Sequence, residues 1–487
     1  MQASMFNVRV PIETGEEVFL MNTFTDAQLI VSRDVVDLLD RVHEDDVFTE
    51  AERAAVDQLV EQGFVVRDRA AERDDLKAFF REVREGTDTL KVTLLTTLQC
   101  NFACDYCIQG DHGDYNKTAA KMTLEMAARV GAWVEARMDA IAPRRLVLTF
   151  FGGEPLLNMP VLYHLAERLH AACADRGVEF LINIITNGLL LSREMVERLN
   201  PLGLNGIKIT LDGDRDAHNR SRPLRGGQGT FDRIIANTRA VADLTRIAVG
   251  GNFEVDTAES YPALLDFLAA QDFAPRLSKV TFKPVIRPST GSGRPELVEG
   301  REKPAAKRGV FPLTVVGGAA ADKPLNGACM TSAGTGVSRV CDTCNFVDEK
   351  MAFLRDETRK RGFATADGVH MGPCEIHKGH AYTIGPDGSL FACPGFAGEA
   401  LQSTGHIDGR IEEYRSQTLR NFETLAAWEQ CHDCAFIPVC AGGCTVAAHN
   451  ELGDMHTPNC HKASFEAGVL SLARDAALTQ AAGASAP

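Results

Sequence analysis

The chain has 487 residues, a hydrophobic content of 45% and a formal net charge of −15. This length exceeds one ordinary domain, so we expect two or three units, each able to bury a core. The acidic balance argues against a nucleic-acid groove or an anionic membrane surface as the main partner. Because no N-terminal apolar segment and no run of membrane-spanning length is present, we expect a cytoplasmic protein.

The first ninety residues have a pattern of their own. Apolar β-like runs are followed by two helical patterns and a further strand-like run, and the charged stretch 67–85 is predicted to be a connecting helix. Strands and helices within residues 1–90 predict a small α+β, winged-helix-like module. The β-like runs are at 8–10, 17–20 and 63–66, and the helical patterns are at 33–42 and 49–62.

Residues 91–287 alternate short β-rich runs with amphipathic helical stretches. Six such repeats predict an α/β fold built from parallel βαβ units, whose ligands lie at the C-terminal ends of the strands. The predicted strands are 91–97, 145–151, 178–185, 206–211, 246–255 and 278–286, and the predicted helices are 123–138, 159–175, 192–199, 230–243 and 258–270.

Three cysteines, Cys100, Cys104 and Cys107, follow the first of these strands and have no fourth cysteine nearby. A cubane iron–sulfur cluster takes one thiolate per iron, so three protein ligands leave one iron free to bind another group. A structural zinc site instead closes its set with four protein side chains. The count therefore favours an open cluster over structural zinc or unconnected cysteines.

The spacing Cys-x3-Cys-x2-Cys, with Tyr106 before the last cysteine, resembles the signature of radical S-adenosylmethionine (radical SAM) enzymes. The resemblance implies a partial (β/α)6 barrel in which the open iron of a [4Fe–4S] cluster chelates SAM. It also implies reductive cleavage of SAM to a 5′-deoxyadenosyl radical. The cofactors carry that chemistry, and the protein positions and shields them.

A glycine pair after the second predicted strand extends the resemblance. Residues 152–155 are similar to the family's GGEP motif, in which backbone and glutamate meet the methionyl amine of SAM. Glycines after a strand allow the close approach of a ligand, although an ordinary strand-to-helix turn has the same composition. The residues that the resemblance assigns to SAM here are Gly152, Gly153 and Glu154.

Other SAM contacts are implied at the ends of later strands. By the same resemblance Thr210 approaches the ribose or carboxylate of SAM, and Arg222 forms a bidentate pair with the carboxylate. Thr186 and Asn187 are candidates for ribose contacts. Alternatively, Arg222 is a solvated charge on a surface loop, and Thr186 and Asn187 only form a turn.

Most of the fourteen cysteines lie in the C-terminal third, which predicts metal ligation because disulfides are rare in the cytoplasm. Their spacing resembles the SPASM domain of radical SAM enzymes that modify peptides and proteins. A pair of zinc knuckles is the alternative, since Cys-x2-Cys also fits zinc. The residues of this pattern are Cys374, Gly388, Cys393, Cys431, Cys434, Cys440, Cys444 and Cys460.

The SPASM resemblance implies two auxiliary [4Fe–4S] clusters, and so three clusters in all. One auxiliary set is a ligand short, and either another cysteine completes it or the site stays open to substrate. The first set is Cys374, Cys393 and Cys444, with Cys344, Cys341 or Cys329 as candidates for the fourth place. The second set is Cys431, Cys434, Cys440 and Cys460.

These patterns divide the chain into five parts. Residues 288–340 lack periodicity and are predicted to be a linker or insertion, and the tail begins as a helix. The expected parts are a peptide-recognition module at 1–90, a radical SAM core at 91–287, the linker at 288–340, a SPASM domain at 341–465 and a tail at 466–487.

Together the resemblances imply an oxidoreductase that matures a ribosomally made precursor peptide. Residues 1–90 would bind the leader of the precursor by strand addition, or only cap the core. The radical would abstract a hydrogen from the core peptide, and an oxidative crosslink, thioether or C–C, would form as the auxiliary clusters accept the second electron. A flavodoxin or ferredoxin is the expected electron donor.

Three rival functions remain open at this stage. An anaerobic sulfatase-maturating type of enzyme oxidises a Ser or Cys of a protein, but the acidic residue that this family carries after the cysteine matching Cys393 is Pro394 here. Peptide epimerisation needs a hydrogen-donating cysteine, for which Cys329 and Cys341 are candidates. A non-catalytic electron carrier would not need the glycine loops at the strand ends.

Overall fold

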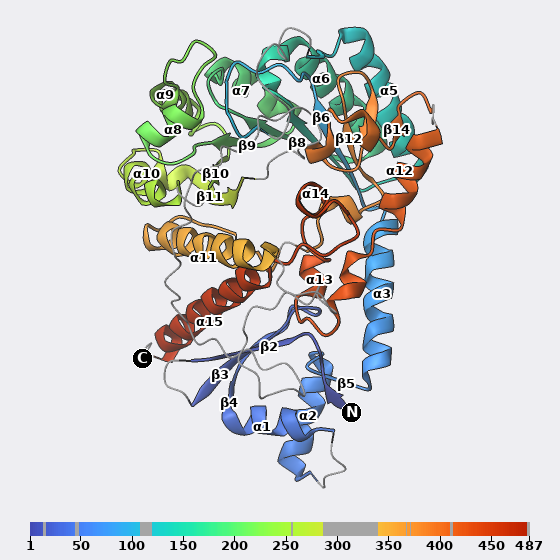
Figure 1. Ribbon diagram of the computed structural model, residues 1–487, viewed down its shortest axis with the longest axis vertical. Coiled ribbons are helices and arrows are strands. Elements are labelled where there is room, and N and C mark those ends of the chain that lie inside the picture. The colour runs from blue at the N-terminus through green and yellow to red at the C-terminus, as the bar shows by residue number, and fades with distance from the viewer. Residues whose placement is uncertain are drawn as a thin grey trace.

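The computed structural model describes most of the chain, and its centre is a nine-stranded sheet flanked by helices (Figure 1). The described residues are 1–12, 16–43, 48–107, 119–254, 257–285, 339–366, 368–370, 372–409 and 413–484. The predicted linker therefore lies almost wholly outside the described residues. So do Cys329 and the side chains of Cys341 and Cys344.

Six consecutive parallel strands form the larger part of this sheet, in the order β11-β10-β9-β8-β7-β6. Helices follow the strands in turn, so the six βαβ repeats predicted from the sequence are confirmed. The strands are β6 Thr89–Leu95, β7 Arg145–Phe151, β8 Glu179–Thr186, β9 Leu204–Thr210, β10 Ile247–Phe253 and β11 Leu277–Pro284. The helices are α5 Leu124–Ile141, α6 Met159–Arg176, α7 Arg193–Leu199, α8 Arg215–Ser221, α9 Phe231–Val241, α10 Tyr261–Ala269 and α11 Arg339–Lys360.

Alternation of side chains explains why these runs form strands. Leu90, Val92 and Leu94 of β6 are buried in the core beneath the helices, while the residues between them face the other side of the sheet. The positions where helices begin are also set by nearby residues. Thr123 and Ser192 accept hydrogen bonds from the first turns of α5 and α7. Helix α8 is short and was not predicted.

Three short strands from the cysteine-rich region continue the sheet beyond β6. β12 pairs with β6 in parallel, and β13 and β14 follow in antiparallel order. The barrel is therefore partial, because its first strand is paired with the C-terminal region and not with its sixth strand. These strands are β12 Ala381–Ile384, β13 Ser389–Phe391 and β14 Gly405–His406.

The N-terminal module is a three-stranded antiparallel sheet with helices, as expected for residues 1–90. In the central strand, Phe19 and Met21 face one core while Leu20 faces another, so both faces of the sheet are covered. Strand β4 and the β1–β5 pair were not predicted. The elements are β1 Gln2–Ala3, β2 Asn7–Pro11, β3 Glu17–Asn22, β4 Gln28–Ser32, α1 Arg33–Arg41, α2 Glu50–Glu61, β5 Val65–Val66 and α3 Arg69–Glu85.

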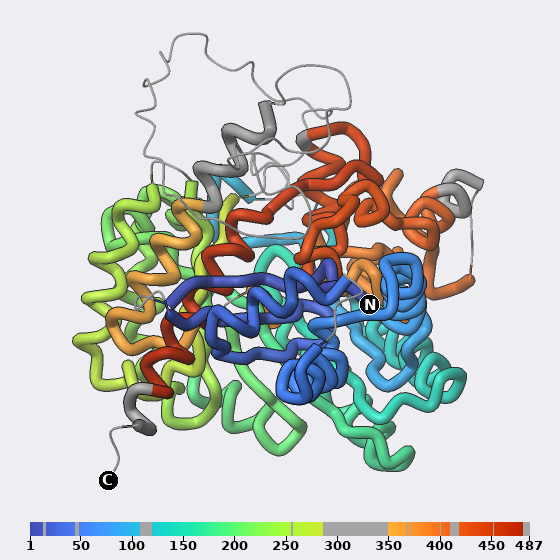
Figure 2. Tube along the Cα trace, turned by 90° about the horizontal axis from the view of Figure 1, so that it is seen from below, coloured from blue at the N-terminus to red at the C-terminus, as the bar shows by residue number. Residues whose placement is uncertain are grey.

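This module packs directly on the C-terminal third of the chain, as the view from below shows (Figure 2). Helix α15 lies against β2 and β3, and helix α11 lies against α15, α10 and β11. Helix α11 therefore follows the sixth strand in space as well as in sequence, so we place it with the barrel. The C-terminal helices are α12 Glu413–Glu423, α13 Ile437–Cys440, α14 Thr445–Ala447 and α15 Lys462–Ala484.

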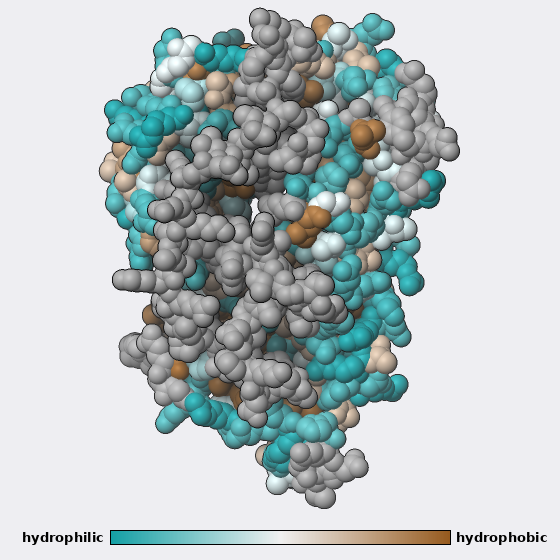
Figure 3. Space-filling view, viewed as in Figure 1, coloured by the Kyte–Doolittle hydropathy of each residue, from teal (hydrophilic) through white to brown (hydrophobic). Residues whose placement is uncertain are grey.

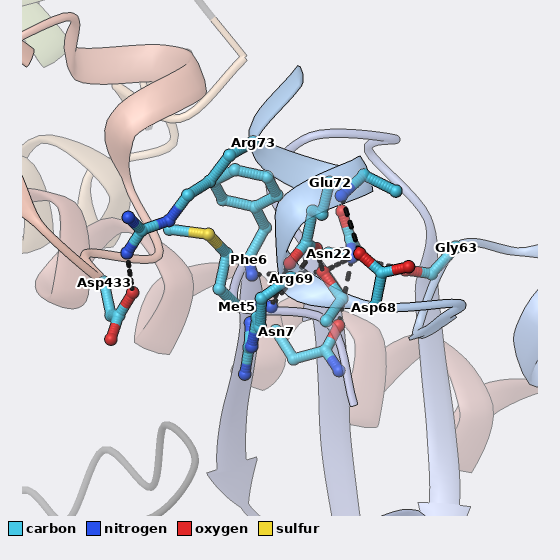
Figure 4. A network of polar contacts seen from close by, with 12 residues as sticks. Met5, Phe6, Asn7, Asn22, Gly63, Asp68, Arg69, Glu72, Arg73 and Asp433 are labelled. Atoms are coloured by element: carbon cyan, nitrogen blue, oxygen red, sulfur yellow. Dashed lines mark hydrogen bonds and ion pairs between the residues drawn. The ribbon is translucent and has the colours of Figure 1, made fainter. Parts of the chain in front are cut away.

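Polar contacts reinforce the docking of the module (Figure 4). The buried Glu72 carboxylate of α3 accepts hydrogen bonds from the backbone N–H of Met5, at 3.0 Å to Oε2, and from the Ser4 hydroxyl. From the neighbouring turn, Arg73 pairs with Asp433 of the cysteine-rich region at 2.8 Å. The side chain of Glu72 thus fixes the N-terminal strands, while Arg73 reaches across to the other region.

The surface carries few exposed apolar side chains. On the face shown in Figure 3 the hydrophobic residues outside the grey atoms are scattered among hydrophilic ones. Among the described residues, large exposed hydrophobic side chains such as Val60, Leu190 and Leu401 stand far apart in the sequence. Within the same residues, no helix combines the length and apolar character needed to cross a membrane.

Candidate functional site

The cysteine loop lies where the sequence predicted it, at the C-terminal end of β6. A backbone group contacts its first thiol, since the N–H of Phe102 donates to Cys100 Sγ at 3.4 Å. The segment after α8 holds the loop from outside: Arg225 Nε donates to the carbonyl of Cys100 at 2.9 Å, and the N–H of Ala103 donates to the carbonyl of Pro223 at 2.9 Å. The loop is thus fixed at several points of its backbone.

The three thiols of this loop share one electrostatic environment. Burial, together with nearby Glu154, Cys104 and Cys107, raises the pKa of Cys100 to about 12. Burial likewise raises the pKa of Cys104 to about 11, an effect that the cation of Arg222 opposes. Without a metal the thiols of Cys100 and Cys104 stay protonated, and binding to iron would release their protons.

The glycine pair approaches the cysteine loop itself. A Cβ on Gly152, which has a φ of +126°, would lie 2.3 Å from the carbonyl oxygen of Thr97, and a Cβ on Gly153 would lie 2.2 Å from that of Gln99. The N–H groups of Gly153 and Glu154 donate to these two carbonyls at 2.8 and 2.9 Å. The glycines therefore let the end of β7 pack against the chain leading to Cys100.

The Glu154 carboxylate joins the ends of β7 and β8. It is 0% exposed and accepts hydrogen bonds from Thr186 Oγ1 at 2.7 Å, from the N–H of Asn187 at 2.8 Å and from the N–H of Leu156 at 3.0 Å. Burial raises its pKa, while these three donors lower it. Asn187 in turn donates to Asn101 Oδ1 at 2.7 Å, next to the first cysteine. Three of the predicted SAM-contacting residues, Glu154, Thr186 and Asn187, are thus brought together.

A second polar network lies beside Cys104. The Tyr106 hydroxyl donates to Asp212, and Arg222 Nη1 donates to the Tyr106 oxygen at 2.5 Å and to Asp212 at 3.5 Å. The backbone N–H of Asn252 donates to Asp212 at 2.7 Å. The aromatic residue of the cysteine signature is therefore bonded to the ends of β9 and β10.

Arg222 is buried at 8% exposure, and its Nε has no hydrogen-bond partner among the described residues. Its other contacts occupy one edge of the guanidinium, and the ring of Phe102 lies 5.5 Å from its Cζ. An unpartnered donor beside a cysteine loop is costly unless a ligand accepts from it. Thr210, on the inner face of β9, is half-buried nearby.

His218 supports this network, although its role was not assigned from the sequence. The N–H of Asp212 donates to Nδ1 at 3.1 Å, so Nε2 carries the proton and faces Thr230 Oγ1 at 3.0 Å. The Thr230 hydroxyl donates to the carbonyl of Arg222 at 2.9 Å. Burial lowers the pKa of His218 well below its ordinary value, so the ring is neutral. It holds the loop that carries Arg222.

The structure brings the C-terminal cysteines together in two groups. Burial raises the pKa of Cys393 to about 12, and the other causes include nearby Cys374 and Cys444. The apolar cluster around Cys393 and Cys444 also contains Leu95 and Leu98, which lead to the first cysteine loop. This group therefore lies beside the barrel.

The other group is Cys431, Cys434, Cys440 and Cys460. Burial raises the pKa of Cys440 well above its ordinary range, and all three of its companions raise it further. Cys434 packs against apolar side chains of the N-terminal module, and the Thr23 hydroxyl donates to the carbonyl of Ala435. This group therefore lies on the module side of the molecule.

The donor sets suit iron–sulfur clusters. Among the described residues, no three His, Cys, Asp or Glu side chains are gathered closely enough to hold a single metal ion. In a cubane each thiolate binds a different iron, so the ligands stand wider apart than around one ion. Grouped thiols with backbone N–H donors at Cys100 and at Cys393, where Gly395 donates at 3.4 Å, fit such clusters.

The fold and site together define a partial α/β barrel with an open three-thiolate loop at the C-terminal ends of its strands. Residues 94–257 match the model of the Radical SAM superfamily. The family implies a [4Fe–4S] cluster and SAM as cofactors.

Curated relatives match part of the chain. The Fe-coproporphyrin III synthase of Methanosarcina barkeri (strain Fusaro / DSM 804) is 26% identical over 199 residues, which cover 40% of this chain and 44% of the relative. The GTP 3′,8-cyclase of Synechococcus sp. (strain CC9605) is 33% identical over 171 residues, covering 34% and 45%. The chain thus spans about half the length of the curated relatives it matches.

Among solved structures, native anSMEcpe with bound AdoMet superposes with a TM-score of 0.54 at 15% identity, over 78% of this chain and 96% of that one. The likeness confirms the fold class predicted from the sequence.

Proposed function

We propose that the chain is a radical SAM maturase that acts on a ribosomally made peptide and forms an oxidative crosslink in it. The observation that carries the proposal is the joining of the Cys100 loop to the ends of β7, β8, β9 and β10 by buried polar side chains. A purely electron-carrying centre needs no such polar site beside an open cluster. When bound, a [4Fe–4S] cluster supplies the electron that cleaves SAM to methionine and a 5′-deoxyadenosyl radical.

The residues of the chain have distinct tasks in this proposal. Cys100, Cys104 and Cys107 hold the cluster. The Nε of Arg222, which has no hydrogen-bond partner among the described residues, donates to the carboxylate of SAM. Glu154 keeps the ends of β7 and β8 in register. The remaining contacts, at Gly152, Gly153, Thr186, Asn187 and Thr210, line the same strand ends.

The C-terminal groups would hold two auxiliary clusters that remove the second electron. Crosslinking takes two hydrogens from the peptide: one leaves as a hydrogen atom to 5′-deoxyadenosine, and the other leaves as a proton and an electron. The group of Cys374, Cys393 and Cys444 adjoins the barrel, so it is the first acceptor. The group of Cys440 lies further along, toward the N-terminal module. A flavodoxin or ferredoxin would supply the first electron.

The N-terminal module would bind the leader of the precursor peptide. Within the described residues, the outer edge of β4 pairs with no further strand, which leaves it open to strand addition. One solved neighbour in the fold comparison, native anSMEcpe, is described with bound AdoMet and the Cp18Cys peptide, at a TM-score of 0.53. That neighbour supports a peptide as the kind of substrate proposed for this chain.

The test is anaerobic reconstitution of the full chain with iron and sulfide, followed by SAM and dithionite. We expect 5′-deoxyadenosine, detected by chromatography, and measurable SAM binding. A chain that binds iron but neither binds SAM nor forms 5′-deoxyadenosine is an electron carrier, and the proposal then fails. A co-expressed precursor should lose the mass of two hydrogens; an unchanged mass with an inverted centre indicates epimerisation instead.

A further inference from the structure

Lys208 is placed on the inner face of the barrel by the alternation of β9. Ile207 and Ile209, on either side of it, are buried in the core beneath the helices. Since successive side chains of a strand point to opposite faces, Lys208 points to the interior. On β11 the same reasoning applies to Lys279, whose neighbour Val280 is buried in that core.

Strand register sets the depth of each lysine. Ala248 of β10 pairs with both Lys208 and Lys279, so these two lysines stand at one level of the sheet. Lys283, four residues further along β11, pairs with Asn252 at the level of the polar network around Tyr106. Three lysines thus line the inner face of β9 and β11, from the middle of the barrel to its mouth.

The side chain of Lys208 lies along the inner surface of β10. A Cβ on Gly250 would stand 2.3 Å from Lys208 Cε and 3.2 Å from Nζ. The absence of a side chain at Gly250 therefore makes the room that the lysine occupies. Any other residue there would displace the ammonium group while leaving its charge in place.

The three charges are close together and uncompensated. Burial, together with the nearby charges of Lys283 and Lys279, lowers the pKa of Lys208 to about 8. In the described part of the chain, none of the three makes an ion pair. The acidic residue on the inner face of these strands, Glu179, lies at the opposite end of β8 and pairs with Arg145 at 2.6 Å. Lys208 is half-buried, whereas Lys279 and Lys283 are exposed. Their like charges still cost stability at Lys208, and an anion would relieve that cost.

Lys283 also links the interior to the second cysteine group. Its charge lowers the pKa of both Cys393 and Cys444, against the larger opposing effect of burial. A group held by the three lysines would therefore lie between the Cys100 loop and the first auxiliary site. The substrate of the proposed reaction must occupy the same interval.

We propose that Lys208, Lys279 and Lys283 bind a carboxylate of the substrate, so that the modified segment is an acidic peptide. The inference rests on the proposed function and names its substrate class. A Glu or Asp side chain and a C-terminal carboxylate share this chemistry, and the experiment separates them. The overall charge of −15 gives no hint of this site, because a net charge does not show where cations gather.

The test is competitive acetylation of the reconstituted full chain with trace acetic anhydride, with each lysine followed by mass spectrometry. The probes, at millimolar concentration with and without SAM, are three peptides: Gly-Gly-Glu-Gly-Gly amide, its Gln counterpart and pentaglycine free acid. We expect the Glu peptide to slow acetylation of Lys208 and Lys283 at least about threefold, and the Gln peptide to leave it unchanged. The exposed Lys360 of α11 is the internal control.

Protection by the free acid alone would assign the site to a C-terminal carboxylate. Equal protection by the Glu and Gln peptides, or none by either acid, overturns the proposal. So does full protection by SAM alone, which would assign the lysines to SAM. This labelling requires no turnover, so it is independent of whether 5′-deoxyadenosine forms.

Two variants complete the test. Lys208→Gln should weaken binding of the Glu peptide about tenfold, equivalent to about 1.4 kcal/mol. Gly250→Ala keeps all three charges and should weaken it to an intermediate extent, because it displaces only the ammonium group. Lys360→Gln is the matched control. Unaltered affinity in Lys208→Gln would also overturn the proposal.

Discussion

The Cys100 loop and the Cys434 loop are held in place by different kinds of contact. The Cys100 loop is fixed by hydrogen bonds from buried polar side chains at strand ends, chiefly Glu154, Asn187 and Arg222. The Cys434 loop is fixed by apolar packing against the N-terminal module, with Phe436 at its centre. Polar groups can exchange their partners for a ligand, whereas apolar contacts only fix a position. The difference indicates that exchangeable chemistry belongs to the first loop alone.

The largest expected effect is removal of a thiol from the first loop. Cys104→Ala should lose about four irons per chain, the content of one cubane, and all 5′-deoxyadenosine formation. The matched control is Cys173→Ala, since Cys173 is buried in α6 beside the sulfur of Met138 at 3.6 Å and has no grouped cysteines. Iron analysis and SAM cleavage check this. Retained cleavage in Cys104→Ala would refute the ligand assignment.

The second-largest effect is expected from weakening the apolar packing that holds the Cys434 loop. Phe436 is 1% exposed and stacks on Phe465 with ring centroids 5.6 Å apart, so Phe436→Ala should cost about 3–5 kcal/mol of stability. Thermal unfolding measures the loss, and limited proteolysis should show release of the N-terminal module. Leu478→Ala, at a site 70% exposed on α15, is the control. An unchanged melting temperature would mean that apolar packing does not hold this region.

Removing the charge of Lys208 should stabilise the protein, whereas removing the Phe436 ring should destabilise it. The charge is there to bind a ligand, and it lowers the stability of the free protein. The pKa of Lys208 falls from 10.5 to about 8 through burial and nearby lysines. Charging it in the folded state therefore costs about 3 kcal/mol below pH 8, and the cost disappears as the pH rises past 10.5. Lys208→Met should raise the melting temperature at pH 7 and have little effect at pH 11. A destabilised variant at pH 7 would contradict this.

The smallest effect is expected at the exposed ion pair between the two regions. The side chains of Arg73 and Asp433 are 52% and 72% exposed, so Asp433→Asn should cost less than about 1 kcal/mol. Unfolding at low and high salt measures it, and the difference should vanish in high salt. A cost above about 2 kcal/mol would show that polar contacts also hold the second loop, and the contrast between the loops would weaken.

The barrel could be predicted from the sequence because its repeats are local. The alternation of Ile207 and Ile209 with polar residues identifies β9, and Thr123 marks the start of α5 without reference to distant residues. Strand β12 was missed because it has four residues and its partner β6 lies about three hundred residues earlier. Such pairing depends on tertiary context.

The sequence allowed us to name candidate residues of the site, but few of the contacts between them. Gly152 and Gly153 also let the end of β7 approach the chain before Cys100, a contact that was not predicted. The hydrogen bonds of His218 and the inward lysines were not predicted, because partners from separate strands are known only once the register is set. The period-two pattern of β9 was the signal that could have located Lys208.

The bond from Thr23 to the carbonyl of Ala435 has a consequence for synthesis of the protein. Its two residues are 412 positions apart, and Val8 and Phe19 likewise pack against Val469. While the ribosome makes the intervening chain, one apolar face of the N-terminal sheet has no native partner, which exposes the nascent protein to aggregation. At elongation rates of about 5–20 residues per second this interval lasts some tens of seconds, during which a chaperone would have time to bind that face.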